Sequence, residues 1–550
     1  MTRPGPLTNI RRYVHLPRTA RSPRIDISDH SLAPTPEELE AINNLPFFQE
    51  EKKVSNRPIT KAKQSYLENK LRIVRQLFKH ECNAEYLSYT LPMSMQNPYL
   101  DAHARATADP ETGAIQYAGT PRLSVTKMLT KRWCELRETY DIYSQIPIYE
   151  HSQVAQGRQV HQMLEEEAHV PIDVEEFKTN FEVTIPNDAF HTLVEDWYAT
   201  TTRLLTLLKT GEAREILCHG YLNPESCRLL KGNVTSDEDI LVSGIIDHLV
   251  LRRRDSSTSA PRPLVSDWDD QYGADALDIR KILERLSVSV KDAKEDMELI
   301  ISDVKTRPTK TVPTQQTVIT AAKLQVMYYR YFMETLGLDA HATYNKLLIN
   351  AQRRGHDVDQ PVEPGKIIYL MEVDPIMKAD MVRLHNGSPI GFEPFDKFYS
   401  QYKKTEACTW ESLTSRITDP LTRQKYGSLF SNWATPVTLR YFAARLAQLY
   451  HILGPLLSSE LMIEYYSGNK NFHNISFTYD SQALMHQSTD SALFWFGKRN
   501  IEPIKPTLRN VLTYCKYCDY QSICLWKKEA KEKAQNLGKD LEKLYPGVRS

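Results

Sequence analysis

Hydrophobic and polar residues recur along this chain with two periods, and these periods predict its strands and helices. Short apolar runs such as "LVSGIIDHLVL" are typical of buried strands, whereas "QQTVITAAKLQVMYYRYFME" has apolar residues at helical spacing. The pattern predicts strands at 214–221, 239–252, 297–306, 461–467 and 474–480, and helices at 61–80, 152–167, 188–209, 275–288, 314–335, 436–458 and 527–543. Residues 98–118 and 252–273 have the composition of loops, and 336–430 alternates short strands with polar loops. Strands and helices alternate, which favours an α/β fold with a central mixed sheet flanked by helices.

Two of the predicted strands end in charged residues. In "LIISDVKTR", Asp303 and Lys305 share one strand face with the apolar Leu299 and Ile301, because alternate residues of a strand point to the same side. Asp247 likewise ends the apolar run "LVSGIID". Two carboxylates at one sheet edge suit a hard divalent cation such as Mg²⁺, and a lysine beside them can steady charge on a phosphoryl group. The alternative is a surface Asp–Lys pair, which contributes little to stability.

Two helices carry further candidate side chains. Gln325 and Tyr329 are four residues apart and lie on one helix face. In "QVAQGRQVHQMLEEE", His161 lies on an apolar stripe one turn after Gly157. This histidine is either a hydrogen-bonded core residue or a metal ligand, and the glycine leaves room for another group to approach.

In combination, these motifs resemble the RecB-type branch of the PD-(D/E)xK nucleases. Gly-x-x-x-His, Gly-x-x-Asp, Asp-x-Lys and Gln-x-x-x-Tyr follow one another in that order. The resemblance implies that His161, Asp247 and Asp303 bind Mg²⁺ or Mn²⁺ together with the backbone carbonyl of Val304. It implies a catalytic role for Lys305, and contact with DNA or ordering of the site for Gln325 and Tyr329. The acid before the lysine is Asp303, where glutamate is commoner.

Three of the eight cysteines lie close together near the end of the chain. Cys515, Cys518 and Cys524 form C-x₂-C-x₅-C, a spacing that predicts a metal centre with a fourth ligand, and zinc is the general expectation. Within the nuclease resemblance the pattern instead implies a [4Fe–4S] cluster, with Cys134 upstream as the fourth ligand. With this pattern, residues 120–530 resemble the exonuclease V family of fungal type.

Charge and composition narrow the choice of partners and compartment. Formal net charge is zero, so local patches must hold any nucleic acid. Candidate patches are Arg252–Arg254, Lys305 with Arg307 and Lys310, Arg353 with Arg354, and Lys498 with Arg499, next to the aromatic residues of "ALFWFGKRN". No apolar run reaches the roughly 18 residues of a membrane span. The first 25 residues contain six arginines and no acid, the composition of a mitochondrial transit peptide or of a disordered basic tail.

The resemblance implies a metal-dependent exonuclease that hydrolyses single-stranded DNA in mitochondrial DNA maintenance. We expect a monomer in the matrix, with a nuclear location as the alternative and a single-strand-binding protein as a candidate partner. The expected organisation is a transit segment at 1–30, an extension at 31–118, a nuclease core at 119–335, a family-specific insertion with further strands at 336–510, and an iron–sulfur segment with a charged helix at 511–550. A non-catalytic DNA-binding or assembly factor with structural zinc, or a nuclease that acts on RNA, are the rival functions.

Overall fold

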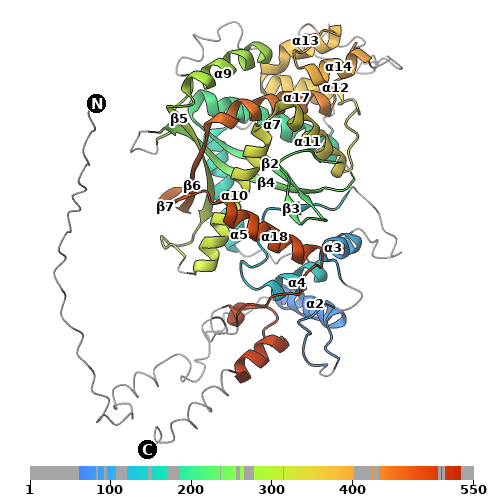
Figure 1. The fold of residues 1–550 in the computed structure, drawn as a ribbon, viewed down its shortest axis with the longest axis vertical. Coiled ribbons are helices and arrows are strands. Elements are labelled where there is room, and N and C mark those ends of the chain that lie inside the picture. Colours follow the sequence, from blue (N-terminus) through green and yellow to red (C-terminus); the bar gives the residue numbers. More distant parts are fainter. Residues whose placement is uncertain are drawn as a thin grey trace, which may run out of the picture. The chain divides into compact units, whose positions relative to one another are not determined.

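A mixed β-sheet organises the part of the chain that the structure describes (Figure 1). The computed structural model describes residues 61–533 except 82–83, 92–95, 107–119, 147–151, 170–185, 236, 255–259, 266–277, 314, 402–419, 421–423, 425–432, 506–509 and 511–513. The strands are β1 (Leu123–Ser124), β2 (Glu212–Asn223), β3 (Arg228–Leu229), β4 (Ile240–Arg253), β5 (Met297–Thr306), β6 (Leu457–Ser467) and β7 (Lys470–Thr478). Their order is β3-β2-β4-β5-β6-β7, and β1 pairs with β4.

The sheet combines antiparallel and parallel pairs. β4 runs antiparallel to β2 and β5, β5 runs parallel to β6, and β6 and β7 form an antiparallel hairpin. β4 and β5 are the central strands, and most of their side chains are buried. The predicted central mixed sheet flanked by helices is therefore confirmed.

Helices pack against this sheet and against one another. The α-helices are α2 (Lys61–Leu77), α3 (Pro98–Ala106), α4 (Glu135–Ser144), α5 (Ser152–Ala168), α7 (Ala189–Thr210), α9 (Ile279–Ala293), α10 (Gln316–Gly337), α11 (Ala340–Arg353), α12 (Pro364–Val373), α13 (Lys378–Asn386), α14 (Glu393–Gln401), α17 (Leu439–Leu453) and α18 (Ser481–Trp495). Three short 3₁₀ helices lie in the described ranges, at Pro375–Met377, Gly454–Leu456 and Cys515–Tyr517. The predicted helices near 61–80, 152–167, 188–209, 275–288, 314–335 and 436–458 correspond to α2, α5, α7, α9, α10 and α17.

The prediction of short strands in 336–430 was wrong where the structure describes that segment. Its described part contains α11, α12, α13 and α14, and the remainder lies outside the described residues. Asp339 caps α11 by accepting a hydrogen bond from the Ala342 N–H, and the apolar residues of α11 recur at helical spacing. α12 is apolar on nearly every side because neighbouring helices bury it, which hides any period. The prediction of a loop at 98–118 was also wrong for 98–106, which form α3, and α18 was not predicted.

A buried ion pair joins these extra helices to the sheet-packing layer. Asp380 of α13 and Arg445 of α17 are both fully buried and form two hydrogen bonds, of 2.6 and 2.8 Å. Tyr441 donates a third hydrogen bond to Asp380, and Arg383 links the same carboxylate to Asp278, the N-cap of α9. A buried carboxylate this well satisfied fixes α9, α13 and α17 relative to one another. Figure 1 shows these three helices at the same end of the compact unit.

Thr60–Lys531 form one compact unit. Among the described helices, none combines the length and the apolar character that crossing a bilayer requires.

We predict that Asp380→Ala lowers the free energy of unfolding by about 3–5 kcal/mol, because it leaves the Arg445 guanidinium buried without its carboxylate. Glu284→Ala is the matched control: it removes the exposed partner of Arg280 on α9 and is expected to cost less than about 0.5 kcal/mol. Urea unfolding followed by circular dichroism measures both. Equal midpoints for the two variants would contradict the assignment.

Candidate active site and cysteine cavity

The candidate site lies where β4 and β5 separate. Their ladder of paired residues ends at His248 and Ser302, so the next residues along each strand, Asp247 and Asp303, face an opening rather than a continuous sheet. The carboxylate of Asp247 accepts a hydrogen bond of 2.8 Å from the Val304 N–H. This contact satisfies a backbone donor that the interrupted pairing leaves free, and it fixes the Asp247 side chain beside β5.

Asp303 and Lys305 form the second part of the site. Asp303 is fully buried, and neither of its carboxylate oxygens accepts a hydrogen bond of normal geometry, although Lys305 Nζ lies 2.6 Å from Oδ2 as an ion-pair partner. Lys305 also donates a 3.1 Å hydrogen bond to Gln325, whose amide donates to the Tyr329 hydroxyl at 2.7 Å. The structure thus brings four predicted residues together in one chain of contacts.

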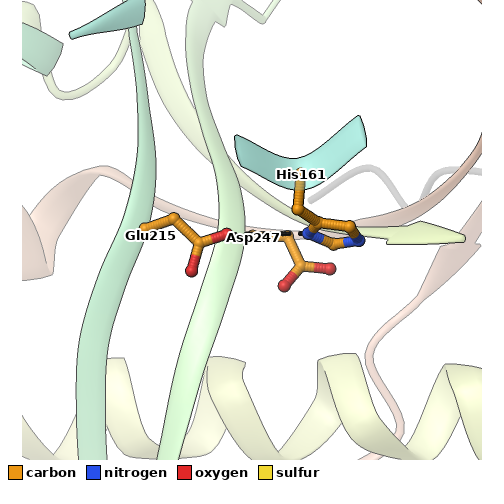
Figure 2. Close-up of side chains that lie close together, drawn as sticks. All are labelled: His161, Glu215 and Asp247. Carbon is orange, nitrogen blue, oxygen red and sulfur yellow. Dashed lines mark ion pairs between the residues drawn. The ribbon is translucent and has the colours of Figure 1, made fainter. Parts of the chain in front are cut away.

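Two further side chains, His161 and Glu215, approach Asp247 from its other side. His161 of α5, Glu215 of β2 and Asp247 of β4 each offer a ligand atom within 4.8 Å of the others. Figure 2 shows the three side chains pointing toward one another from one helix and two neighbouring strands. His161 Nδ1 and Glu215 Oε1 are 3.6 Å apart. Nitrogen and oxygen donors of this kind can hold a divalent cation. Asp303 lies outside this tight group and next to Asp247.

Sequence reasoning did not single out Glu215. The pairs Arg214–His248 and Ile216–Ile246 place Glu215 directly opposite Asp247, and Glu215 has a φ of 54°, which interrupts regular strand geometry. The available signal was weak: Glu215 lies at the start of the predicted strand at 214–221, directly after the charged Arg214. The pairing register that brings it to Asp247 is not visible in the sequence.

The helices that supply the site cover opposite faces of β5. Lys305 contacts α10, whereas its neighbour Val304 packs against Leu164 of α5, and successive strand residues point to opposite faces. α5 approaches closely because a Cβ at Gly157 would lie 3.0 Å from the Thr306 hydroxyl. The room left by Gly157 is therefore used by β5 itself. His161 reaches Asp247 where the strands separate, so groups from both faces meet there.

The electrostatics of the site favour a bound cation. Burial and the neighbouring Asp303 carboxylate raise the pKa of Asp247 to about 7. The contact with Glu215 raises the pKa of His161, against the opposing effect of its burial. Several acidic groups thus lie together in a partly buried space, and the buried oxygens of Asp303 accept no hydrogen bond of normal geometry beyond the ion pair with Lys305. A divalent cation would satisfy these oxygens, so the residues present fit a metal.

The predicted cysteine ligands also come together. A small cavity that is partly open to solvent is lined by Cys134, Cys515, Cys518 and Cys524, among other side chains. Cys134 is the N-cap of α4, and its Sγ accepts a 3.5 Å hydrogen bond from the Ile504 N–H. Cys524 directly precedes a helix at 525–533. Helix N-termini and N–H donors favour negative charge on sulfur.

The thiols of this cavity are unfavourable as free thiolates. Burial above all, and the nearness of the other sulfurs, raise the pKa of Cys515 to about 12, that of Cys518 to about 12 and that of Cys524 to about 11. Four converging thiols with this electrostatic conflict fit a metal or a metal cluster, which removes the conflict by replacing the protons. Cys218 and Cys227 are buried elsewhere, without such neighbours among the cysteines that line the cavity.

Known proteins match nearly the whole chain. The profile of a family described as "Exonuclease V - a 5' deoxyribonuclease" matches residues 115–527. The chain belongs to the exonuclease V family. A protein named "Exonuclease V, mitochondrial" from Kluyveromyces lactis is 42% identical, with 97% of this chain and 99% of that protein covered. Proteins of the same name from Eremothecium gossypii and Saccharomyces cerevisiae are 45% and 37% identical, with 88% and 92% of this chain and 91% and 89% of those proteins covered.

Several basic and aromatic residues that the sequence offered for DNA contact have internal roles in this exonuclease V. The buried Arg353 binds a backbone carbonyl, Arg252 pairs with Glu298 and Glu460, and Lys498 donates to two carbonyls. Arg499 binds Glu135 through both terminal nitrogens. Trp495 is 1% exposed, so its ring has no free face for a nucleobase. The sequence pattern made these residues candidates for contact with DNA, but in the structure their side chains bind other parts of the protein and stabilise the fold.

We predict that this exonuclease V binds Mn²⁺ more tightly as pH rises through about 7. Below that pH the Asp247 carboxyl holds a proton, which a cation must displace, so the apparent Kd should rise about tenfold per pH unit below 7. Calorimetric titrations between pH 5.5 and 8.5 measure this dependence. Asp247→Asn should weaken binding and flatten the profile, whereas the exposed Asp292→Asn should leave both unchanged. An affinity that is equal at pH 6 and pH 8 in the unmodified protein would rule out this role for Asp247.

Proposed function

We propose that this protein is a divalent-metal-dependent exonuclease that hydrolyses single-stranded DNA, and that His161, Glu215, Asp247 and Asp303 hold the metal. The observation that carries the proposal is the cluster of acidic side chains at the separation of β4 and β5, with Lys305 beside it. The backbone carbonyl of Val304 is the remaining proposed metal ligand. The N–H of the same residue binds Asp247. Membership of the exonuclease V family supports DNA as the substrate.

The metal, Mg²⁺ or Mn²⁺, would lower the pKa of a bound water and neutralise charge on the scissile phosphate. Lys305 is held between Asp303 and Gln325, so its ammonium group remains in one place. From there it can donate a hydrogen bond to a phosphate oxygen or to the attacking water. Tyr329 orients Gln325, and Gly244 makes room for the Tyr329 ring, because a Cβ there would lie 2.7 Å from it.

We further propose that Cys134, Cys515, Cys518 and Cys524 bind a [4Fe–4S] cluster. The cavity that they line, the helix N-termini and the N–H donor to Cys134 support this cofactor. The ligands come from regions separated by most of the described chain. If the cluster acts as a cross-link, loop-closure entropy gives an upper limit of about 6 kcal/mol of stabilisation. The cluster therefore has a structural role, distant in function from bond cleavage.

The names of the relatives support a mitochondrial location, to which the arginine-rich residues 1–30 would direct the chain. These residues lie outside the described part of the structure. The description of the family supports attack from 5′ ends. We propose a monomer that works on single strands, with a single-strand-binding protein as a partner. A non-catalytic assembly factor has less support, because all the acidic residues and the lysine are present and in contact.

We predict that Asp303→Asn, Lys305→Met and Glu215→Gln each reduce cleavage of end-labelled single-stranded DNA to below about a tenth of the unmodified rate. Binding of single strands should change less than about threefold, since phosphate contacts elsewhere supply affinity. Lys291→Met is the matched control, because it removes an exposed lysine of α9 that belongs to none of the candidate DNA-contact patches. The assay is run with Mg²⁺ on DNA and RNA strands of one sequence. Faster cleavage of the RNA strand would favour the RNA-directed alternative, and full activity of Lys305→Met would remove the proposed mechanism.

We also predict that Ala at Cys134, Cys515, Cys518 or Cys524 removes the visible absorbance of the anaerobically purified protein and lowers its melting temperature. Cys218→Ala, at a buried thiol outside the cavity, should retain both iron and absorbance. Iron, sulfide and zinc are determined on each preparation. One zinc per chain without iron or sulfide would identify a structural zinc site instead.

A further inference from the structure

Residues 61–91 precede the segment that the exonuclease V profile matches, yet they pack against the cysteine cavity. The Leu87 N–H donates a 2.7 Å hydrogen bond to the carbonyl of Ile523, and Leu87 pairs with Cys524 as an isolated parallel bridge. Tyr140 of α4 donates to the carbonyl of Ser88 at 2.7 Å. Figure 1 shows α2 and α4 side by side at this end of the compact unit. The upstream segment thus holds the backbone next to one proposed cluster ligand.

A buried lysine makes the second connection. The Lys70 side chain of α2 is 4% exposed, and its Nζ lies 2.6 Å from Asp141 and 3.1 Å from Asp519. Asp519 directly follows Cys518, and Asp141 accepts a 2.7 Å hydrogen bond from Tyr520. Lys70 therefore ties α2 both to α4, which begins after Cys134, and to the chain between Cys518 and Cys524.

The sign of these charges matters for an anionic cofactor. A [4Fe–4S] cluster with four thiolate ligands has a net negative charge, and Asp141 and Asp519 would add two more negative charges close to it. Arg137, which lines the cavity, lies 3.7 Å from Asp141 and offsets part of this charge. Lys70 is the ammonium that contacts both carboxylates. Without it, two partly buried acids would face a cofactor of the same sign.

We propose that residues 61–91 form a strap that retains the cysteine-bound cofactor, and that Lys70 is its positioning residue, which neutralises Asp141 and Asp519 beside the cavity. This inference rests on the proposed cluster, and it assigns a function to a segment that the family profile does not include. Two independent contacts carry it: the backbone pairing of Leu87 next to Cys524 and the buried contacts of Lys70.

The test compares Lys70→Met, Lys70→Arg and Arg75→Met in the full chain. Arg75→Met removes one exposed positive charge from the same helix and is the matched control. Iron and sulfide per chain are measured after a fixed anaerobic exposure to a chelator. We expect Lys70→Met to lose about fivefold more iron than the unmodified protein, and Lys70→Arg and Arg75→Met to stay within about twofold of it. Equal iron in Lys70→Met and Arg75→Met would overturn the proposal.

A charge-balanced variant separates this role from simple misfolding. Lys70→Met combined with Asp141→Asn and Asp519→Asn removes the cation together with both acids, so the combination should regain most of the iron that Lys70→Met loses. If it stays as poor in iron as Lys70→Met, neutralisation is not the function of Lys70. Mn²⁺ binding at the candidate active site and circular dichroism report whether each variant is folded. Absence of iron from the unmodified protein would refute the proposed cluster itself rather than the role of Lys70.

Discussion

The separation of β4 and β5 after the His248–Ser302 pair is the constraint on which the candidate active site depends. In an uninterrupted ladder the Val304 N–H would have a backbone partner, and it would not be available as a hydrogen-bond donor to the Asp247 carboxylate. Because the ladder ends, the carboxylate takes that donor, and the opening admits side chains from both faces of the sheet. The cost of placing acids in this opening is visible in the raised pKa of Asp247.

The other face of the sheet holds the strands together at the same place. His248 Nδ1–H donates to the carboxylate of Glu464 of β6 at 2.8 Å, across β5, and its second nitrogen faces Glu212 of β2 at 3.4 Å. Burial opposes the ionisation of Glu464, but the hydrogen bond with His248 lowers the pKa of Glu464 to about 2. A charged pair just before the opening can restrain how far β4 moves from β5 and β6. The ion pair of His248 and Glu464 can thereby hold in place the strands that carry Asp247 and Asp303, from the opposite face of the sheet.

The sequence predicted those features of this protein that depend on local patterns. It did not predict the features that depend on which strands pair and in which register. Asp303 and Lys305 were visible because charge is unusual at the end of an apolar strand, and the cysteine trio was visible from its spacing. Glu215 was missed because its importance lies in being opposite Asp247, a relation between two strands. α12 was missed because burial of most of its residues removes the polar face that reveals a helix. α11, α13 and α14 are only 14, 9 and 9 residues long, so each shows few repeats of the helical period. Arg353 and Arg499 resembled DNA contacts because a sequence does not show which charges face inward.

The arrangement of the cysteine cavity bears on how the chain is made. The cavity is lined by residues within 133–140 and 514–527, and α2 contacts both regions through Lys70. These parts lie near opposite ends of the described chain. A ribosome adds about 5–20 residues per second, so tens of seconds separate the emergence of α2 from that of Cys524. The sheet can assemble during this interval, whereas the cavity cannot. A chain interrupted before Cys515 would contain every residue of the candidate active site but only one of the four proposed cluster ligands, so under this proposal a filled cavity requires synthesis to have passed Cys524.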